Sequence, residues 1–165
     1  MKKIPVFLLL LFLSLKAQDT SFVYNPNIFK WKYLTTTDWY NVYYDSLRVK
    51  ITDDVLECWM LYEPLPEQLN FLRMFRSSDN IEDEELATRY LKFAYSLHYH
   101  FWVCEKKLDY IMIFIDFDTD GEIIVFYNFE ENGRWFDLSG DRYGENIIAA
   151  ICDLYHKLKQ TKTKN

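Results

Sequence analysis

Glycine and proline are scarce in this 165-residue chain, with four of each, and there are only three cysteines. So few glycines exclude a collagen-like repeat and leave little for the Gly-rich loops that hold phosphates. Three cysteines are too few for a disulfide-dense small domain. Lys and Arg (19) are outnumbered by Asp and Glu (25), and this argues against nucleic acid as a partner, because its phosphates need cations.

Catalytic signatures are missing as well. The sequence has no G-x-S-x-G, no H-E-x-x-H and no phosphate-binding glycine loop. We therefore expect no catalytic residue and no cofactor. What the chain does have is 13 Tyr, 13 Phe and 5 Trp in a sequence that is half hydrophobic. A chain this rich in aromatic residues can bury enough surface to fold, so disorder is excluded.

The N-terminus has the pattern of a secretory signal. Lys2 and Lys3 precede an apolar run over 4–13, which is too short to span a membrane, and Ala17 supplies the small residue before cleavage. We predict a signal peptide at 1–17 and export to the periplasm, the cell surface or the medium. Its removal takes three lysines and leaves 16 basic against 25 acidic residues, a net charge of −9. No second long apolar run follows, so we expect no transmembrane segment in the mature chain.

The mature chain, 18–165, has a normal single-domain length and shows no linker or internal repeat. Five of its segments alternate with period two or are rich in β-formers: 40–45, 55–62, 95–104, 110–117 and 122–129. Asp120-Gly121 separates the last two segments and predicts a hairpin turn. We expect an antiparallel, meander-like sheet of about five to six strands.

Two stretches differ from this strand pattern. The one from 64 to 90 carries two prolines and an acidic run at 82–85; it predicts a long excursion with one short helix after the polar cluster at 77–80. We interpret the acidic run as a solvent-exposed surface. Beyond Glu145, apolar residues recur with helical spacing at Ile147, Ile148, Ile151, Leu154, Tyr155 and Leu158. This predicts an amphipathic C-terminal helix on the sheet, a frayed tail at about 160–165, and the α+β class.

An exported chain meets oxidising conditions, so its cysteines are candidates for a disulfide. Three pairings are possible, and each leaves one cysteine over. Cys104 ends a predicted strand, and Cys152 lies at the margin of the apolar stripe of the C-terminal helix. Cys58 shares a strand face with apolar residues, which suits a buried free thiol. The pattern therefore favours Cys104–Cys152 with Cys58 unpaired.

Two groups of residues are weak metal candidates. Asp116, Asp118, Asp120 and Glu122 follow the first half of a calcium loop, but its twelfth position is Tyr127 and the flanks read as strands. A tight hairpin whose acids face solvent is the favoured interpretation. His98 and His100 have a spacing that zinc sites use, but no third ligand lies near them in sequence, and packing is favoured.

Taken in order, several short motifs resemble the surface-adhesin protein E family of exported bacterial domains. The matching residues span about 30 to 153: Trp31-Lys-Tyr33, Val42-Tyr-Tyr-Asp45, Val49, Val55–Leu61 with Trp59, Val103–Lys107, Tyr110–Phe117, Asp120-Gly121, Trp135 and Ile151-Cys152. The resemblance implies an antiparallel sheet with a C-terminal helix, and its cysteine pair maps onto Cys104 and Cys152. It also implies adhesion to host matrix or serum proteins, with a homodimer as one arrangement.

This chain departs from the family in three ways: it lacks a lipobox cysteine, it is strongly acidic, and its 64–90 excursion matches no family motif. No ligand-binding residue is therefore carried over. The leading hypothesis is an exported, non-enzymatic binding or adhesion module. The alternative is a periplasmic structural or accessory protein that binds another envelope component. A third hypothesis is a metal-dependent enzyme that uses 116–122 or the two histidines.

Overall fold

The computed structural model describes residues 28–79, 82–130, 133–140 and 144–162, and the predicted signal peptide at 1–17 lies outside them. The strands are β1 (Trp31–Thr36), β2 (Tyr40–Asp45), β3 (Lys50–Thr52), β4 (Val55–Pro64), β5 (Phe93–Val103), β6 (Leu108–Asp118), β7 (Ile123–Asn128) and β8 (Phe136–Asp137). The helices are α2 (Pro66–Ser78), α3 (Glu84–Tyr90), the 3₁₀ turn η4 (Cys104–Lys106) and α4 (Glu145–Lys162).

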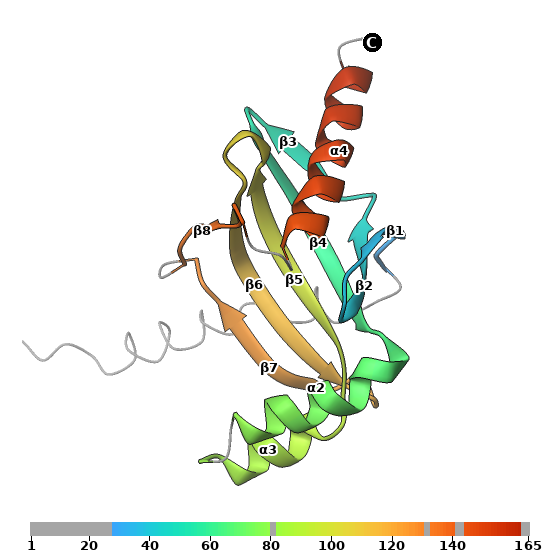
Figure 1. Cartoon of the computed structure of the whole chain (residues 1–165), viewed down its shortest axis with the longest axis vertical. Helices are drawn as coiled ribbons and strands as arrows, with labels where there is room; N and C mark the ends of the chain where they lie inside the picture. Colours follow the sequence, from blue (N-terminus) through green and yellow to red (C-terminus); the bar gives the residue numbers. More distant parts are fainter. Residues whose placement is uncertain (1–27, 80–81, 131–132, 141–143, 163–165) are drawn as a thin grey trace, which may run out of the picture.

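The strands form one antiparallel sheet in the order β1-β2-β4-β5-β6-β7, with β3 beside β4 and β8 beside β6 (Figure 1). The six strands of this path and the C-terminal helix confirm the α+β prediction. Strand β1 and the short strands β3 and β8 are not among the five predicted segments; β3 and β8 have only three and two residues, which give no readable alternation. The predicted β6–β7 hairpin is confirmed: Gly121 has φ +82°, a value that a turn glycine adopts without steric cost.

The short helix predicted after 77–80 is confirmed as α3, but the 64–90 excursion also contains the longer helix α2, which was not predicted. The polar cluster there ends α2, whose C-cap is Asp79, and Asp83 caps α3 by accepting from Leu86 N–H at 2.9 Å. Pro64 and Pro66 read as helix breakers, yet Pro66 occupies the first turn of α2, where a missing N–H costs nothing. Helix α2 therefore lies before the polar cluster, where no helix was predicted.

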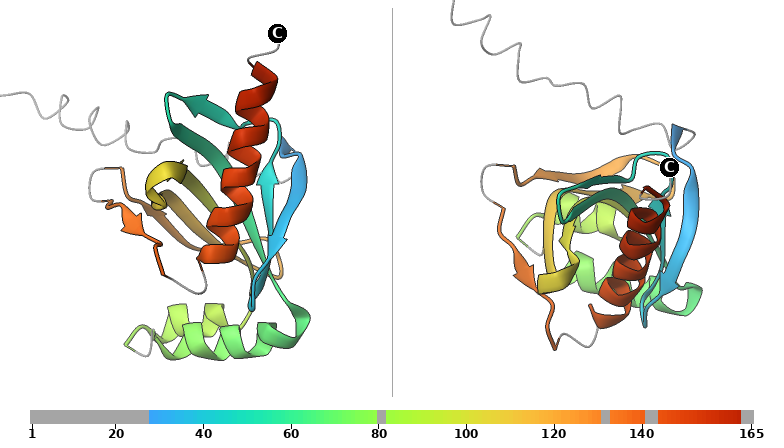
Figure 2. Two further views of the ribbon diagram at one scale, coloured as in Figure 1. Left: turned by 45° about the horizontal axis from the view of Figure 1, so that its top comes forward. Right: turned by 90° about the horizontal axis from the view of Figure 1, so that it is seen from above.

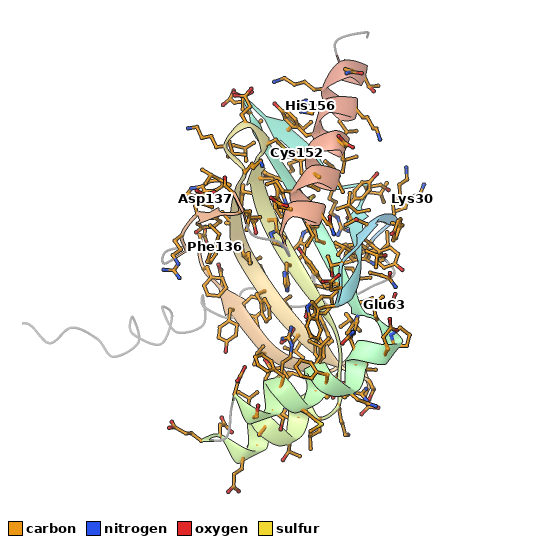
Figure 3. The ribbon with its side chains drawn as sticks, in the orientation of Figure 1. Lys30, Glu63, Phe136, Asp137, Cys152 and His156 are labelled. Atoms are coloured by element: carbon orange, nitrogen blue, oxygen red, sulfur yellow. A yellow bond between two sulfur atoms is a disulfide. The ribbon has the colours of Figure 1, made fainter. Side chains whose placement is uncertain are left out.

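Helix α4 confirms the predicted apolar stripe, since Ile148, Ile151 and Tyr155 are buried. They pack on residues of β2, β4 and β5, and the strands curve around the helix when the molecule is seen from above (Figure 2). The helix continues to Lys162, so residues 160–162 of the tail expected to fray are helical. Cys152, labelled in Figure 3, forms a disulfide with Cys104 of η4, and Cys58 is a buried free thiol.

The two faces of the sheet have separate cores. One face carries the helices: its even-numbered β4 residues pack with α4, and Leu72 of α2 packs near Phe93. The opposite face is covered near the N-terminus by Phe29, which joins Trp59 and Leu97 in a second cluster. Strand alternation thus sends neighbouring β5 residues to different environments, and this sets the position of the candidate site.

Candidate functional site

The helix-bearing face of the sheet holds a cleft between α2 and the start of α4. Its volume is about 300 Å³, at the lower end for small-molecule sites. Alternation along β5 places Ser96, His98, His100 and Trp102 in its wall. The other residues that line it are Thr37, Trp39, Tyr40, Tyr62, Arg76, Asp109, Ile111, Leu138, Gly144 and Ile147. Aromatic rings therefore make up much of the surface.

One side of the cleft is fixed by a chain of three buried side chains. His100 Nδ1 donates to Asp109 Oδ1 at 2.8 Å, which makes His100 Nε2 the acceptor for the Tyr62 hydroxyl at 3.1 Å. Burial, with Asp109 nearby, raises the pKa of Tyr62 well above its usual value, so the phenol stays protonated and donates. Both nitrogens of His100 are thus occupied. This row of hydrogen-bonded side chains orients the rings of His100 and Tyr62, and it leaves His100 no free nitrogen that could act as a base.

A second polar group, centred on Asp116, closes the cleft toward α2. Asp116 is fully buried and pairs with Arg76 of α2. It also accepts hydrogen bonds from Ser96 and, at 3.0 Å, from the Tyr90 hydroxyl. The Arg76 guanidinium lies over the Phe93 ring at 4.4 Å. These contacts tie α2 and α3 to β5 and β6, and the cationic charge in the cleft is compensated by Asp116.

Two polar atoms of the cleft lining stay unpaired. His98 Nε2 and Trp102 Nε1 are both buried, and neither has a hydrogen-bond partner among the residues that the structure describes. Trp102 is only 1% exposed. Burial, above all, lowers the pKa of His98 well below its usual value, so its imidazole is neutral. Buried polar groups are normally bonded, so a ligand or water that reached these two atoms would be stabilised.

The 116–122 loop does not gather its acids around one point. Asp116 bonds to Arg76 on the helix-bearing face, whereas Asp118 Oδ1 accepts the backbone N–H groups of Asp120 and Glu122 at 2.9 and 2.8 Å. Asp120 lies 3.4 Å from Lys92, and Glu122 is exposed. The prediction that these acids face solvent is wrong for Asp116 and Asp118, which are buried because they bond inward and to the turn.

His98 and His100 lie on the same strand face with ring centroids 5.4 Å apart. His100 is used by Asp109 and Tyr62, and His98 packs against the Phe114 ring at 4.5 Å. Within the described ranges, no three His, Cys, Asp or Glu side chains come together as a metal site would require.

A second candidate surface is the outward side of α2. Phe71, Met74 and Phe75 are 52%, 69% and 52% exposed, and their i, i+3, i+4 spacing puts them on one stripe. Phe71 contacts the Trp39 ring at 5.2 Å, and Trp39 also lines the cleft. Met74 lies with Leu91 in a shallow groove of about 610 Å³ between α2 and α3, which Glu84 borders.

We call this set, Trp39, Phe71, Met74, Phe75 and Leu91, the α2 face. The sequence carried its signal, since apolar residues at 71, 74 and 75 have helical spacing, but the two prolines obscured the helix. Tyr62 and Asp109 could not have been found in the same way, because their partner His100 lies 38 and 9 residues away.

No model of a known protein family matches the chain, and no curated protein matches it. Among solved structures, it is similar to Haemophilus influenzae protein E, with a TM-score of 0.44 and 14% identity over 77% of this chain and 86% of that one. A second structure of that protein, in crystal form II, gives 0.42 and 12% over 74% and 94%. The resemblance predicted from the sequence is thus confirmed as a distant likeness of fold.

Within the described ranges, none of the helices combines the length and the apolar character that crossing a membrane requires.

Proposed function

We propose that this chain is an exported, non-enzymatic binding module that recognises another protein through the α2 face. The observation that carries this is the exposed stripe of Phe71, Met74 and Phe75 on a helix whose other side is packed on the sheet. Large apolar side chains exposed in a group are typical of interaction sites. Aromatic rings with few rotatable bonds are also common anchors of protein interfaces.

The acidic residues around the α2 face indicate which charge a partner should carry. Glu82, Asp83, Glu84 and Glu85 are all exposed at the start of α3, next to the groove that Met74 and Leu91 line. An acidic rim favours a partner whose apolar anchors are flanked by Lys or Arg. Such a segment in a matrix, serum or envelope protein fits the adhesion hypothesis. Export is supported by the signal pattern at 1–17 and by the Cys104–Cys152 disulfide, because disulfides persist in oxidising compartments.

The test is a capture experiment with the mature chain, 18–165, against purified matrix and serum proteins and against solubilised envelope. We expect a partner whose binding falls at least about tenfold in the double variant Phe71→Ser/Phe75→Ser, since central apolar anchors dominate interfaces. Charge reversal by Glu84→Lys and Glu85→Lys should weaken binding further and reduce its salt dependence. Leu47→Ser, at a 65% exposed site outside the α2 face, is the matched control.

Binding that is equally strong in Phe71→Ser/Phe75→Ser and wild type would exclude the α2 face. Location is tested separately: protease treatment of intact cells should cleave a surface protein, whereas a protein released only from the periplasm contradicts adhesion and favours the accessory role. Self-association of the mature chain that disappears in the same double variant would identify a second copy as the occupant instead.

A further inference from the structure

The cleft between α2 and α4 shares only Trp39 with the α2 face and offers chemistry that protein adhesion does not use. We propose that it binds a small, uncharged aromatic compound that carries a hydrogen-bond acceptor. The inference stands on three observations: the unpaired buried polar atoms, the ring-lined wall and the compensated charges. Each of them restricts the ligand in a different way.

The unpaired atoms require a polar partner. Trp102 Nε1 can only donate, and it belongs to a side chain that is 1% exposed. His98, the other unpaired group, is a neutral imidazole and can donate or accept. A ligand with an acceptor for Trp102 and a mixed group for His98, such as a carboxamide, would satisfy both. Bonding these atoms removes the cost of leaving buried polar groups unpaired.

The wall favours a flat ring. Ring centroids of His100 and Trp102 lie 5.0 Å apart at an interplanar angle of 22°, and those of Tyr62 and His98 lie 4.4 Å apart at 33°. A wall of stacked and tilted rings presents faces and edges that another aromatic ring can contact. The volume of about 300 Å³ admits one or two fused rings and excludes a larger cofactor.

The charges favour a neutral ligand. Arg76 lines the cleft but pairs with Asp116, and Asp109 lines it but accepts from His100. An anion would meet Asp109, and a cation would meet Arg76, each without an available counter-charge. A neutral compound avoids both desolvation costs.

Nicotinamide is a suitable probe because it is planar, neutral and carries a carboxamide. The readout is the indole N–H resonance of Trp102 in ¹H–¹⁵N spectra, assigned by its loss in Trp102→Phe. We expect it to shift saturably with nicotinamide at concentrations up to about 10 mM, tenfold above a millimolar Kd. Nicotinate, which has the same ring but is an anion, tests whether the ligand must be neutral. Cyclohexanecarboxamide, which keeps the carboxamide on a saturated ring, tests whether the ring must be aromatic. Both should shift this resonance far less at equal concentration.

Variants then assign the contacts. Calorimetry with nicotinamide should show a loss of about tenfold in Trp102→Phe and in His98→Phe, the loss expected for one hydrogen bond. Ile111→Trp, which fills the cleft without removing either polar atom, should abolish binding. Trp135→Phe, at a 45% exposed residue that does not line the cleft, is the matched control and should bind as the wild type does. Circular dichroism and the remaining indole resonances report whether each variant is folded.

A Trp102 resonance that nicotinamide does not move would overturn the proposal and indicate that water alone fills the cleft. Equal shifts with all three compounds would overturn it too, by showing no selection for a neutral ring. Because Phe71→Ser/Phe75→Ser replaces no residue that lines the cleft, nicotinamide binding should persist in that variant. The result for the cleft is therefore independent of the result for protein adhesion.

Discussion

Helices α4 and α2 pack on the same face of the sheet, yet they are held there in different ways. Helix α4 buries Ile148, Ile151 and Tyr155 and is joined covalently to η4 through Cys152. Helix α2 buries one leucine, Leu72, and is further fixed by the Arg76–Asp116 ion pair. Its largest apolar residues face outward instead.

This difference separates the part of the molecule that stabilises the fold, around α4, from the part that is available for binding, around α2. Apolar packing and the disulfide hold α4, and the one hydroxyl of its buried stripe, that of Tyr155, is already bonded to Asp54 and Lys159. Directional polar contacts hold α2 at a few points, which leaves both its outer stripe and the cleft beneath it available. The predictions below test this division, from the largest expected effect to the smallest.

Removing the disulfide should have the largest effect. Cys104 and Cys152 are 48 residues apart, and opening a loop of that length costs about 4 kcal/mol in the chain-entropy model. We expect Cys104→Ser/Cys152→Ser to lower the free energy of unfolding by about that amount in urea titrations. Reductant should act likewise on wild type and on Cys58→Ala. An unfolding midpoint that reductant does not change would contradict the assignment of α4 as a covalently fixed element.

Truncation of a buried residue of α4 comes next. Ile151 is fully buried, so Ile151→Ala should lower the free energy of unfolding by about 3 kcal/mol through lost burial and a cavity. Phe71→Ala in α2 removes a larger side chain that is half exposed, and it should change stability by less than about 0.5 kcal/mol. Similar losses in the two variants would show that α2 is packed as α4 is.

The ion pair is the corresponding test for α2. Arg76→Met leaves the buried Asp116 carboxylate without its cation and should cost about 2–3 kcal/mol, somewhat less than a fully buried pair because the Arg76 side chain is 20% exposed. Asp116→Asn added to Arg76→Met should restore part of this loss, since an amide needs no counter-charge. Urea unfolding of wild type, the two single variants and the double variant gives the coupling energy between Arg76 and Asp116. Additive losses of stability would argue against an ion pair.

His98 gives the smallest effect, and it depends on pH. Its pKa is lowered by burial in the folded protein, so the unfolded chain binds more protons below about pH 6.5. Stability should therefore be full above that pH and fall as the pH drops, by up to about 1.4 kcal/mol per pH unit. His98→Phe should flatten this part of the curve, whereas a substitution at the exposed His156 should not. Identical pH profiles for wild type and His98→Phe would contradict a buried, neutral imidazole.

Sequence reasoning predicted the parts of the molecule that rest on local periodicity. Alternation gave β2, β4, β5 and β6, and the stripe from Ile147 gave α4. Helix α3 was predicted, whereas α2 was missed because a proline such as Pro66 can either break a helix or begin one. Asp116 was read as solvent-facing because its partner Arg76 lies 40 residues earlier, and only the folded sheet brings the two together.

The cleft shows the same limit of prediction from local sequence patterns. His98 and His100 attracted attention as an H-x-H pair, and the strand does place them on one face. Their different states, one neutral and unpaired and the other held by Asp109 and Tyr62, depend on β4 and β6. Spacing along the chain therefore locates the histidines, while tertiary pairing decides their chemistry.

The bond between Cys104 and Cys152 also closes a covalent ring that contains β6, β7 and β8. The exposed tip of the β6–β7 hairpin at Asp120 lies inside this ring. A protease that cuts there would produce two polypeptides that still migrate as one molecule until a thiol is added. Helix α4 would remain attached to the strands on which it packs, so the domain would tolerate a nick that in an uncrosslinked sheet would leave the segment after the cut without a covalent bond to the rest.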